Sequence, residues 1–117
     1  MAHSFRDLTV WQRAMQLTVS IYRLTREFPR EEIYGLTSQM RRSAVSVPSN
    51  IAEGVARQAD KELIYFLHVA LGSIAELDTL YILAKEFRYT DGCTAIEKAI
   101  EDVRKMTVGL LKRLKKD

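Results

Sequence analysis

A line of polar side chains recurs every three or four residues between positions 39 and 57 of this sequence. Because a helical turn takes between three and four residues, such a line follows one side of a helix. Glu53 and Arg57 stand four residues apart, the spacing at which a carboxylate and a guanidinium pair along a helix. Glu76 is a candidate counter-charge for Arg42 or Arg57. The predicted polar cluster comprises Gln39, Arg42, Asn50, Glu53, Arg57 and Glu76.

This polar cluster has two interpretations. In the first, it sets the packing of helices or a contact between subunits, because buried polar pairs can specify how helices align. In the second, it contacts a ligand or nucleic acid. A parallel line farther along the chain runs through Tyr65, Val69, Gly72, Glu76 and Thr79. We expect Gly72, which has no side chain, to permit a close approach between helices.

The basic residues are unevenly distributed, although the net charge is only +3. Every basic residue before position 61 is an arginine, and lysines crowd the end of the chain. Arginine suits the planar, bidentate recognition of carboxylate or phosphate. The candidate nucleic-acid contacts are Arg41, Arg42, Arg57, Lys112, Arg113, Lys115 and Lys116. Solvated helix faces and a basic tail are the alternative explanation of the same charges.

Residues that could catalyse a reaction or hold a cofactor are sparse. The single cysteine, Cys93, lies near a predicted helix start, where a thiolate can be favoured, but has no obvious partner. No Glu-x-x-His pair of the kind used by two-metal bundles occurs, and the Gly-rich phosphate-binding motifs are missing. We therefore expect no catalytic residue, no metal and no cofactor, and so a protein that is not an enzyme.

The elements that carry these residues are four segments with helical periodicity. They are predicted over residues 7–28, from 31 or 34 to 57, 60–88, and from 90–91 to the chain end, and each has apolar residues at alternating three- and four-residue spacing. Asp60 and the pair Thr90–Asp91 are predicted to cap the third and fourth helices. Short connections favour antiparallel neighbours. The fold class is therefore all-α, an up-and-down antiparallel four-helix bundle formed by one domain, 1–117.

Pro48 interrupts the second helix, because proline lacks an amide donor and crowds the carbonyl four residues earlier. The apolar spacing continues in phase from Ala44 through Val47 to Ile51. We therefore predict one helix that is kinked at Pro48 rather than two helices.

The composition, 47% apolar and 28% charged residues, is that of an ordinary globular domain. No uninterrupted apolar run reaches the roughly 18–20 residues that span a bilayer, and the first residues lack the apolar core of a signal peptide. We expect a cytoplasmic protein that does not insert into a membrane. Apolar residues also flank the main stripes and predict an interface between subunits; they are Leu8, Trp11, Met15, Tyr22, Ile64, Phe66, Leu71 and Ile82.

Four segments of the sequence resemble the bacterial 23S rRNA intervening-sequence protein family. They are FRDLTVWQRA at 5–14, GLTSQMRRSA at 35–44, VPSNIAEG at 47–54 and FLHVALGSIAE at 66–76. The block around Pro-Ser-Asn-Ile-Ala-Glu-Gly is the most specific of them, and the last helix is similar only in general character.

The resemblance implies a four-helix bundle that assembles into a ring, a homopentamer, without enzymatic activity. Accessory proteins of diversity-generating retroelements are related to this family, and those relatives are basic pentamers that bind nucleic acid and a reverse transcriptase. The partner it implies here is RNA or a nucleic-acid-processing protein. The charge of +3 is modest beside those relatives. A protein–protein scaffold without nucleic-acid affinity is the alternative function.

Overall fold

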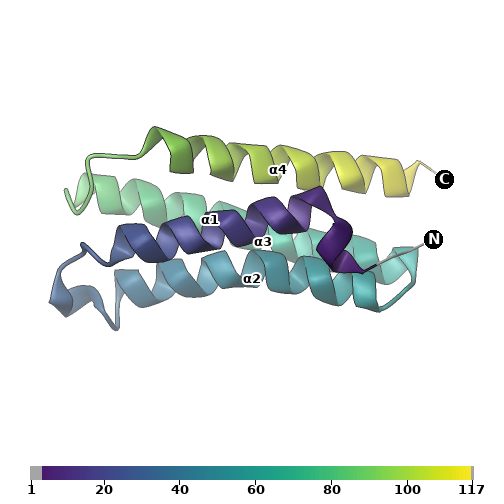
Figure 1. Ribbon diagram of the computed structural model, residues 1–117, viewed down its shortest axis with the longest axis horizontal. Helices are drawn as coiled ribbons and strands as arrows, with labels where there is room; N and C mark the ends of the chain where they lie inside the picture. Colours follow the sequence, from purple (N-terminus) through teal and green to yellow (C-terminus); the bar gives the residue numbers. More distant parts are fainter. Residues whose placement is uncertain (1–3, 117) are drawn as a thin grey trace.

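Four long helices account for most of the computed structural model, which describes residues 4–116. They are α1 (Thr9–Thr25), α2 (Leu36–Ala56), α3 (Asp60–Glu86) and α4 (Thr94–Lys115), with short 3-10 helices η1 (Phe5–Asp7) and η2 (Arg30–Glu32). Successive helices run in opposite directions along a body of 46 × 22 × 20 Å, so that α1 begins and α4 ends at the same end (Figure 1). The described residues contain no strand. The prediction of an all-α four-helix bundle is confirmed.

At the starts of α1, α3 and α4, the residue that was expected to begin or cap the helix has another role in the structure. Asp7 belongs to η1, and α1 begins at Thr9. Asp60 is the first residue of α3 instead of its cap, since the carbonyl of Ala59 already accepts the first helical hydrogen bonds. The hydroxyl of Thr90 accepts from the amide of Gly92, which turns the chain, and α4 therefore starts later than predicted.

Helix α2 passes through Pro48 without a break, which confirms a single helix there, whereas the kink stays a prediction. Proline has no amide to offer the carbonyl of Ala44. That carbonyl instead accepts a hydrogen bond from the hydroxyl of Thr18 on α1, at 3.1 Å. The hydroxyl also lies 2.9 Å from the carbonyl of Ala14 in its own helix. The single hydroxyl proton of Thr18 is shared between the two carbonyls, so α1 supplies a donor within reach of the acceptor that proline leaves on α2.

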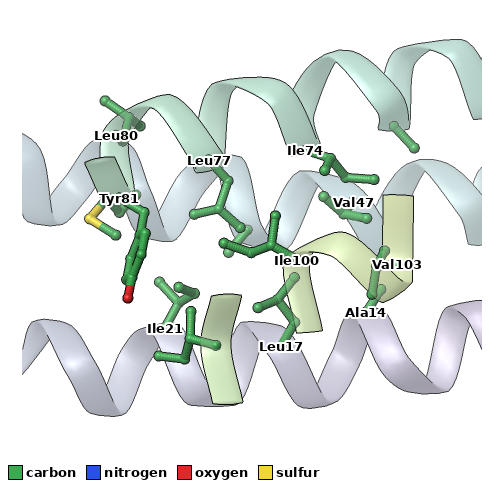
Figure 2. Packing of buried hydrophobic residues seen from close by; sticks show 14 of the residues in the cluster. Ala14, Leu17, Ile21, Val47, Ile74, Leu77, Leu80, Tyr81, Ile100 and Val103 are labelled. Carbon is green, nitrogen blue, oxygen red and sulfur yellow. The ribbon is translucent and has the colours of Figure 1, made fainter. Parts of the chain in front are cut away.

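The core is formed by one apolar stripe from each helix. Figure 2 shows Leu17 of α1, Val47 of α2, Leu77 of α3 and Ile100 of α4 gathered between the helices. Each of these side chains is at most 4% exposed. Each helix contacts its two neighbours, so α1 and α3 lie diagonally across the bundle, as do α2 and α4.

The first turn of α2 is held by a side chain that precedes the helix. One carboxylate oxygen of Glu32 accepts from the amide of Leu36 at 2.9 Å, and the other accepts from the hydroxyl of Tyr89 at 2.8 Å. These two hydrogen bonds, the amide one foremost, hold the pKa of Glu32 below its ordinary value of 4.5. Glu32 thus ties the start of α2 to the connection between α3 and α4.

The lowered pKa of Glu32 predicts a pH-dependent contribution to stability. The carboxylate stabilises the fold above its unfolded pKa of about 4.5, and this contribution is lost as the pH falls through the lower folded value. We expect Glu32→Gln to melt at a lower temperature than the parent at pH 7, and the gap to narrow below pH 4. Thermal denaturation between pH 3 and 7 measures this difference in melting temperature. A difference that does not change with pH would contradict the stabilising role of the Glu32 carboxylate.

Candidate functional site

The residues of the predicted polar cluster do not come together in one place. Gln39 and Arg42 lie in the second turn of α2, Asn50 lies in its middle, and Glu53 and Arg57 lie at its end. At about 1.5 Å per residue, the first and last of them are about 27 Å apart along the helix. One face of a long helix therefore spreads these side chains into three groups.

The middle group is a chain of hydrogen bonds between α2 and α3. The amide of Asn50 donates to the carbonyl of Ser46 at 2.8 Å and lies 3.0 Å from its hydroxyl. The hydroxyls of Ser46 and Ser73 are 2.7 Å apart, which links the two helices. All three side chains are half-buried. This group links α2 to α3 through Ser73, a partner that the sequence did not indicate, and its role in helix packing stays a prediction.

The end group centres on the guanidinium of Arg57. It donates to Glu53 at 2.9 Å, which raises the pKa of Arg57, and it lies 3.5 Å from a carboxylate oxygen of Glu62. It also covers the ring of Phe66, 5.3 Å from the centroid. The pairing of Glu53 with Arg57 is as predicted, but the second carboxylate belongs to Glu62 instead of Glu76. Because the charged side chains are half-exposed, such pairs add little stability.

The third group lines a shallow polar groove between α2 and α3. Gln39, Arg42 and Glu76 share it with Ser43 and Ser46. Among the described residues, neither Arg42 nor Glu76 forms an ion pair within 4 Å. The groove therefore brings the predicted counter-charges to one place without joining them, and both remain available to a partner.

The candidate nucleic-acid contacts are also divided. Arg41 is engaged within the fold: its guanidinium donates to the hydroxyl of Thr25 at 2.8 Å and lies 4.6 Å from the centre of the Tyr22 ring. Arg57 is engaged by its two carboxylates. Both arginines are therefore held by contacts within the fold, and their contact with nucleic acid stays a prediction.

The last turns of α4 hold the remaining cations. Lys115 contacts His68 of α3 at 2.9 Å between nitrogens. Lys112, Arg113 and Lys116 are exposed and form no ion pair within residues 4–116. They lie at the end of the bundle where α1 begins and α2 ends (Figure 1). Cations at a helix C-terminus also interact favourably with the helix dipole.

Lys105 and Arg13, which the sequence analysis did not name as candidate contacts, lie along the seam between α1 and α4, and Lys105 is 3.8 Å from a carboxylate oxygen of Glu101. Lys105 and Arg113 line one groove with the first residues of α1, and Arg13 lines a second groove with Lys98. Lys105 and Arg113 are eight residues apart, which is a same-face helical spacing that could have indicated them. Asp102, in the second groove, already pairs with Lys98 at 2.8 Å.

Helix α3 leaves an unusual amount of apolar surface uncovered. It is long and apolar enough to cross a membrane by length and composition, and 28% of its most apolar 18-residue window is buried. The expectation from the sequence rested only on apolar runs, and this window differs in that it can include charged residues; the expectation that the protein does not insert into a membrane stays a prediction. Of the flanking residues predicted to form an interface, Met15, Tyr22 and Ile82 are exposed, whereas Leu8, Trp11, Ile64 and Leu71 pack against the core and Phe66 lies under Arg57.

Two further features bear on metal binding and on titratable groups. Within residues 4–116, no group of three or more histidine, cysteine, aspartate or glutamate side chains is placed to hold a metal ion. Burial raises the pKa of Tyr81 to about 12, and its hydroxyl bridges Glu97 and the amide of Cys93. This bridge fastens α3 to the start of α4 and is a structural feature.

Comparison with known proteins gives a family match. Residues 6–109 match the family described as 23S rRNA-intervening sequence protein. The match runs from η1 into α4 and ends before the cations at Lys112, Arg113 and Lys116. No curated protein matches the chain. The basic last turns of α4 thus lie outside the part of the chain that the family match covers.

Proposed function

Because the chain belongs to the 23S rRNA-intervening sequence protein family, we propose that it is a non-enzymatic, cytoplasmic helical bundle that assembles with copies of itself into a ring and associates with RNA. The family match supports an intervening-sequence protein, and the proposal adds the assembly and the partner. A ring of five copies would multiply the charge of +3 to about +15, a field that a single chain does not produce.

The observation that carries the RNA association is the exposed cation group formed by Lys112, Arg113 and Lys116. Cations without acidic partners are available to phosphate groups, and phosphate contacts supply most of the affinity in sequence-independent binding. The chain carries no motif that reads bases. We therefore expect binding through the phosphate backbone that tolerates changes of RNA sequence.

A titration of structured and single-stranded RNA at about 50 and 200 mM salt tests this association, because counterion release makes such binding weaken steeply with salt. We expect the double variant Lys112→Gln/Arg113→Gln to bind RNA more weakly and with a smaller salt dependence. The slope of the logarithm of the binding constant against the logarithm of the salt concentration should decrease in magnitude by about one for each phosphate that is no longer neutralised. The control Arg30→Gln/Lys85→Gln removes the same charge at the opposite end of the bundle. Equal decreases in affinity for both variants would show that the last turns of α4 are not the RNA-binding site.

The assembly is tested by the mass of the protein in solution. The exposed apolar surface of α3 supports it, because contiguous apolar surface marks an interface. Light scattering is expected to give about 67 kDa, five times the 13.5 kDa chain. A monomer at micromolar concentration would contradict the assembly, and an assembled protein that binds no RNA at the lower salt would favour the protein scaffold.

A further inference from the structure

One line of side chains on α3 faces away from the bundle and carries a single charge. It runs through Tyr65, Val69, Gly72, Glu76 and Thr79 and continues to Leu83, and we call it the α3 line. Tyr65 is 62% exposed, and Val69 and Leu83 are more than one-third exposed. Apart from Glu76 and Thr79, whose hydroxyl donates to the carbonyl of Ala75, the line is apolar, aromatic or bare backbone over about 27 Å, at about 1.5 Å per residue. A surface of this kind is suited to packing against another apolar surface.

A second apolar surface lies on the other side of the bundle, over α1 and α2. Met15, Val19 and Tyr22 follow one face of α1, and Val45 of α2 lies across the seam; we call these four residues the α1/α2 patch. Each of them is 39–46% exposed. Their exposure leaves apolar area on α1 and α2 that no element of the same chain covers.

The charges around the two surfaces are of opposite sign. Helix α1 contains no acidic residue; of its two arginines, Arg23 follows Tyr22 whereas Arg13 lies toward α4, and Arg41 of α2 lies over the ring of Tyr22. Helix α3 contains five acidic residues and two lysines. If either surface paired with its own copy, like charges would meet. If the α1/α2 patch pairs with the α3 line, opposite charges meet, and this arrangement is favoured.

We propose that the α1/α2 patch of one copy packs against the α3 line of the next, with Glu76 facing Arg41, which lies over the ring of Tyr22 beside the patch. This inference rests on the proposed self-assembly and names the two faces that would form it. Since α1 and α3 lie diagonally across the bundle, one chain can engage both faces at once. In a growing assembly, one end then has a free α1/α2 patch and the other end a free α3 line. Further copies add through the same contact until the two ends meet and close a ring.

Gly72 allows the α3 line to be blocked without disturbing the fold. A Cβ built at Gly72 meets no atom within 4 Å, so a longer side chain there extends into solvent in the free chain. Gly72→Gln is therefore expected to keep the fold, and replacing a helical glycine favours the helix. Gly109→Gln is the matched control, because Gly109 of α4 is also open, with its nearest atom at 3.9 Å, and lies on neither surface.

Two variants that each block one face test the proposed interface. Gly72→Gln blocks the α3 line, and Val19→Glu places an acidic residue in the α1/α2 patch, where it would face Glu76. Light scattering is expected to show each variant alone at the 13.5 kDa of one chain, and Gly109→Gln at the mass of the parent. Mixed in equal amounts, the two variants should form a pair of about 27 kDa, twice the mass of the chain, because each still carries the face that is blocked in the other.

Other outcomes would overturn the proposal in different ways. If only one variant dissociates, its surface pairs with itself; if neither does, the interface lies elsewhere and self-assembly stands. A monomeric parent would overturn both the assembly and this inference, and its co-sedimentation with phosphatidylcholine–phosphatidylglycerol vesicles would assign the α3 line to a lipid surface. Circular dichroism and melting temperature are measured for every variant, to separate a blocked interface from an unfolded chain.

Discussion

Replacing Gly54 with alanine is expected to lower the free energy of unfolding by about 1–3 kcal/mol, the usual cost of an extra methyl group in a closely packed contact. A Cβ built at Gly54 on α2 would lie 2.9 Å from Cδ1 of Leu63 and 2.9 Å from Cβ of Phe66 on α3. The Phe66 atom adjoins the backbone and cannot swing away. The alanine therefore forces the two helices apart where they cross.

The size of this effect can be separated from the general preference of helices for alanine. Alanine in place of glycine inside a helix stabilises it by about 0.5–1 kcal/mol when space is available. Gly109→Ala on α4 meets nothing closer than 3.9 Å and is expected to melt at or above the temperature of the parent. Each kcal/mol of destabilisation lowers the melting temperature of a domain of this size by several degrees. Equal melting temperatures for the two variants would show that α2 and α3 do not approach closely at Gly54.

Replacing Thr18 with valine is expected to cost about 1–3 kcal/mol, because it leaves the carbonyl of Ala44 without a donor. The hydroxyl of Thr18 lies 3.1 Å from that carbonyl, and Ala44 is 1% exposed. Valine has nearly the same shape as threonine, so the missing hydrogen bond dominates the change. Chemical denaturation of parent and variant measures it.

A second substitution tests the link between Thr18 and Pro48. Pro48→Ala restores a backbone amide that can donate to the carbonyl of Ala44, as in any helix. In that background, Thr18→Val is expected to cost less than it does alone, so the two changes are not additive. An equal cost in both backgrounds would show that Thr18 acts through packing and not by satisfying the acceptor left by proline.

The polar line on α2 shows where sequence spacing stops being informative. Spacing correctly placed Glu53 beside Arg57, since residues four apart on a helix are always neighbours. It did not identify Glu62 or Ser73 as partners, because these contacts depend on the register between α2 and α3. The same limit applies to Arg41, which the sequence named as a candidate nucleic-acid contact without indicating that its guanidinium is hydrogen-bonded to Thr25 of α1.

Sequence alone determined the four helices and their buried faces, because helical periodicity and core burial follow the same repeat of about 3.6 residues. It also indicated the family through its local segments. Only the tertiary structure decided which glycine lies at a close crossing. Gly72 was expected there, yet it faces open space, and Gly54 is the one against α3. The physical reason is that spacing fixes the angle of a residue around its own helix, whereas the neighbour it meets depends on how the helices are arranged around the core.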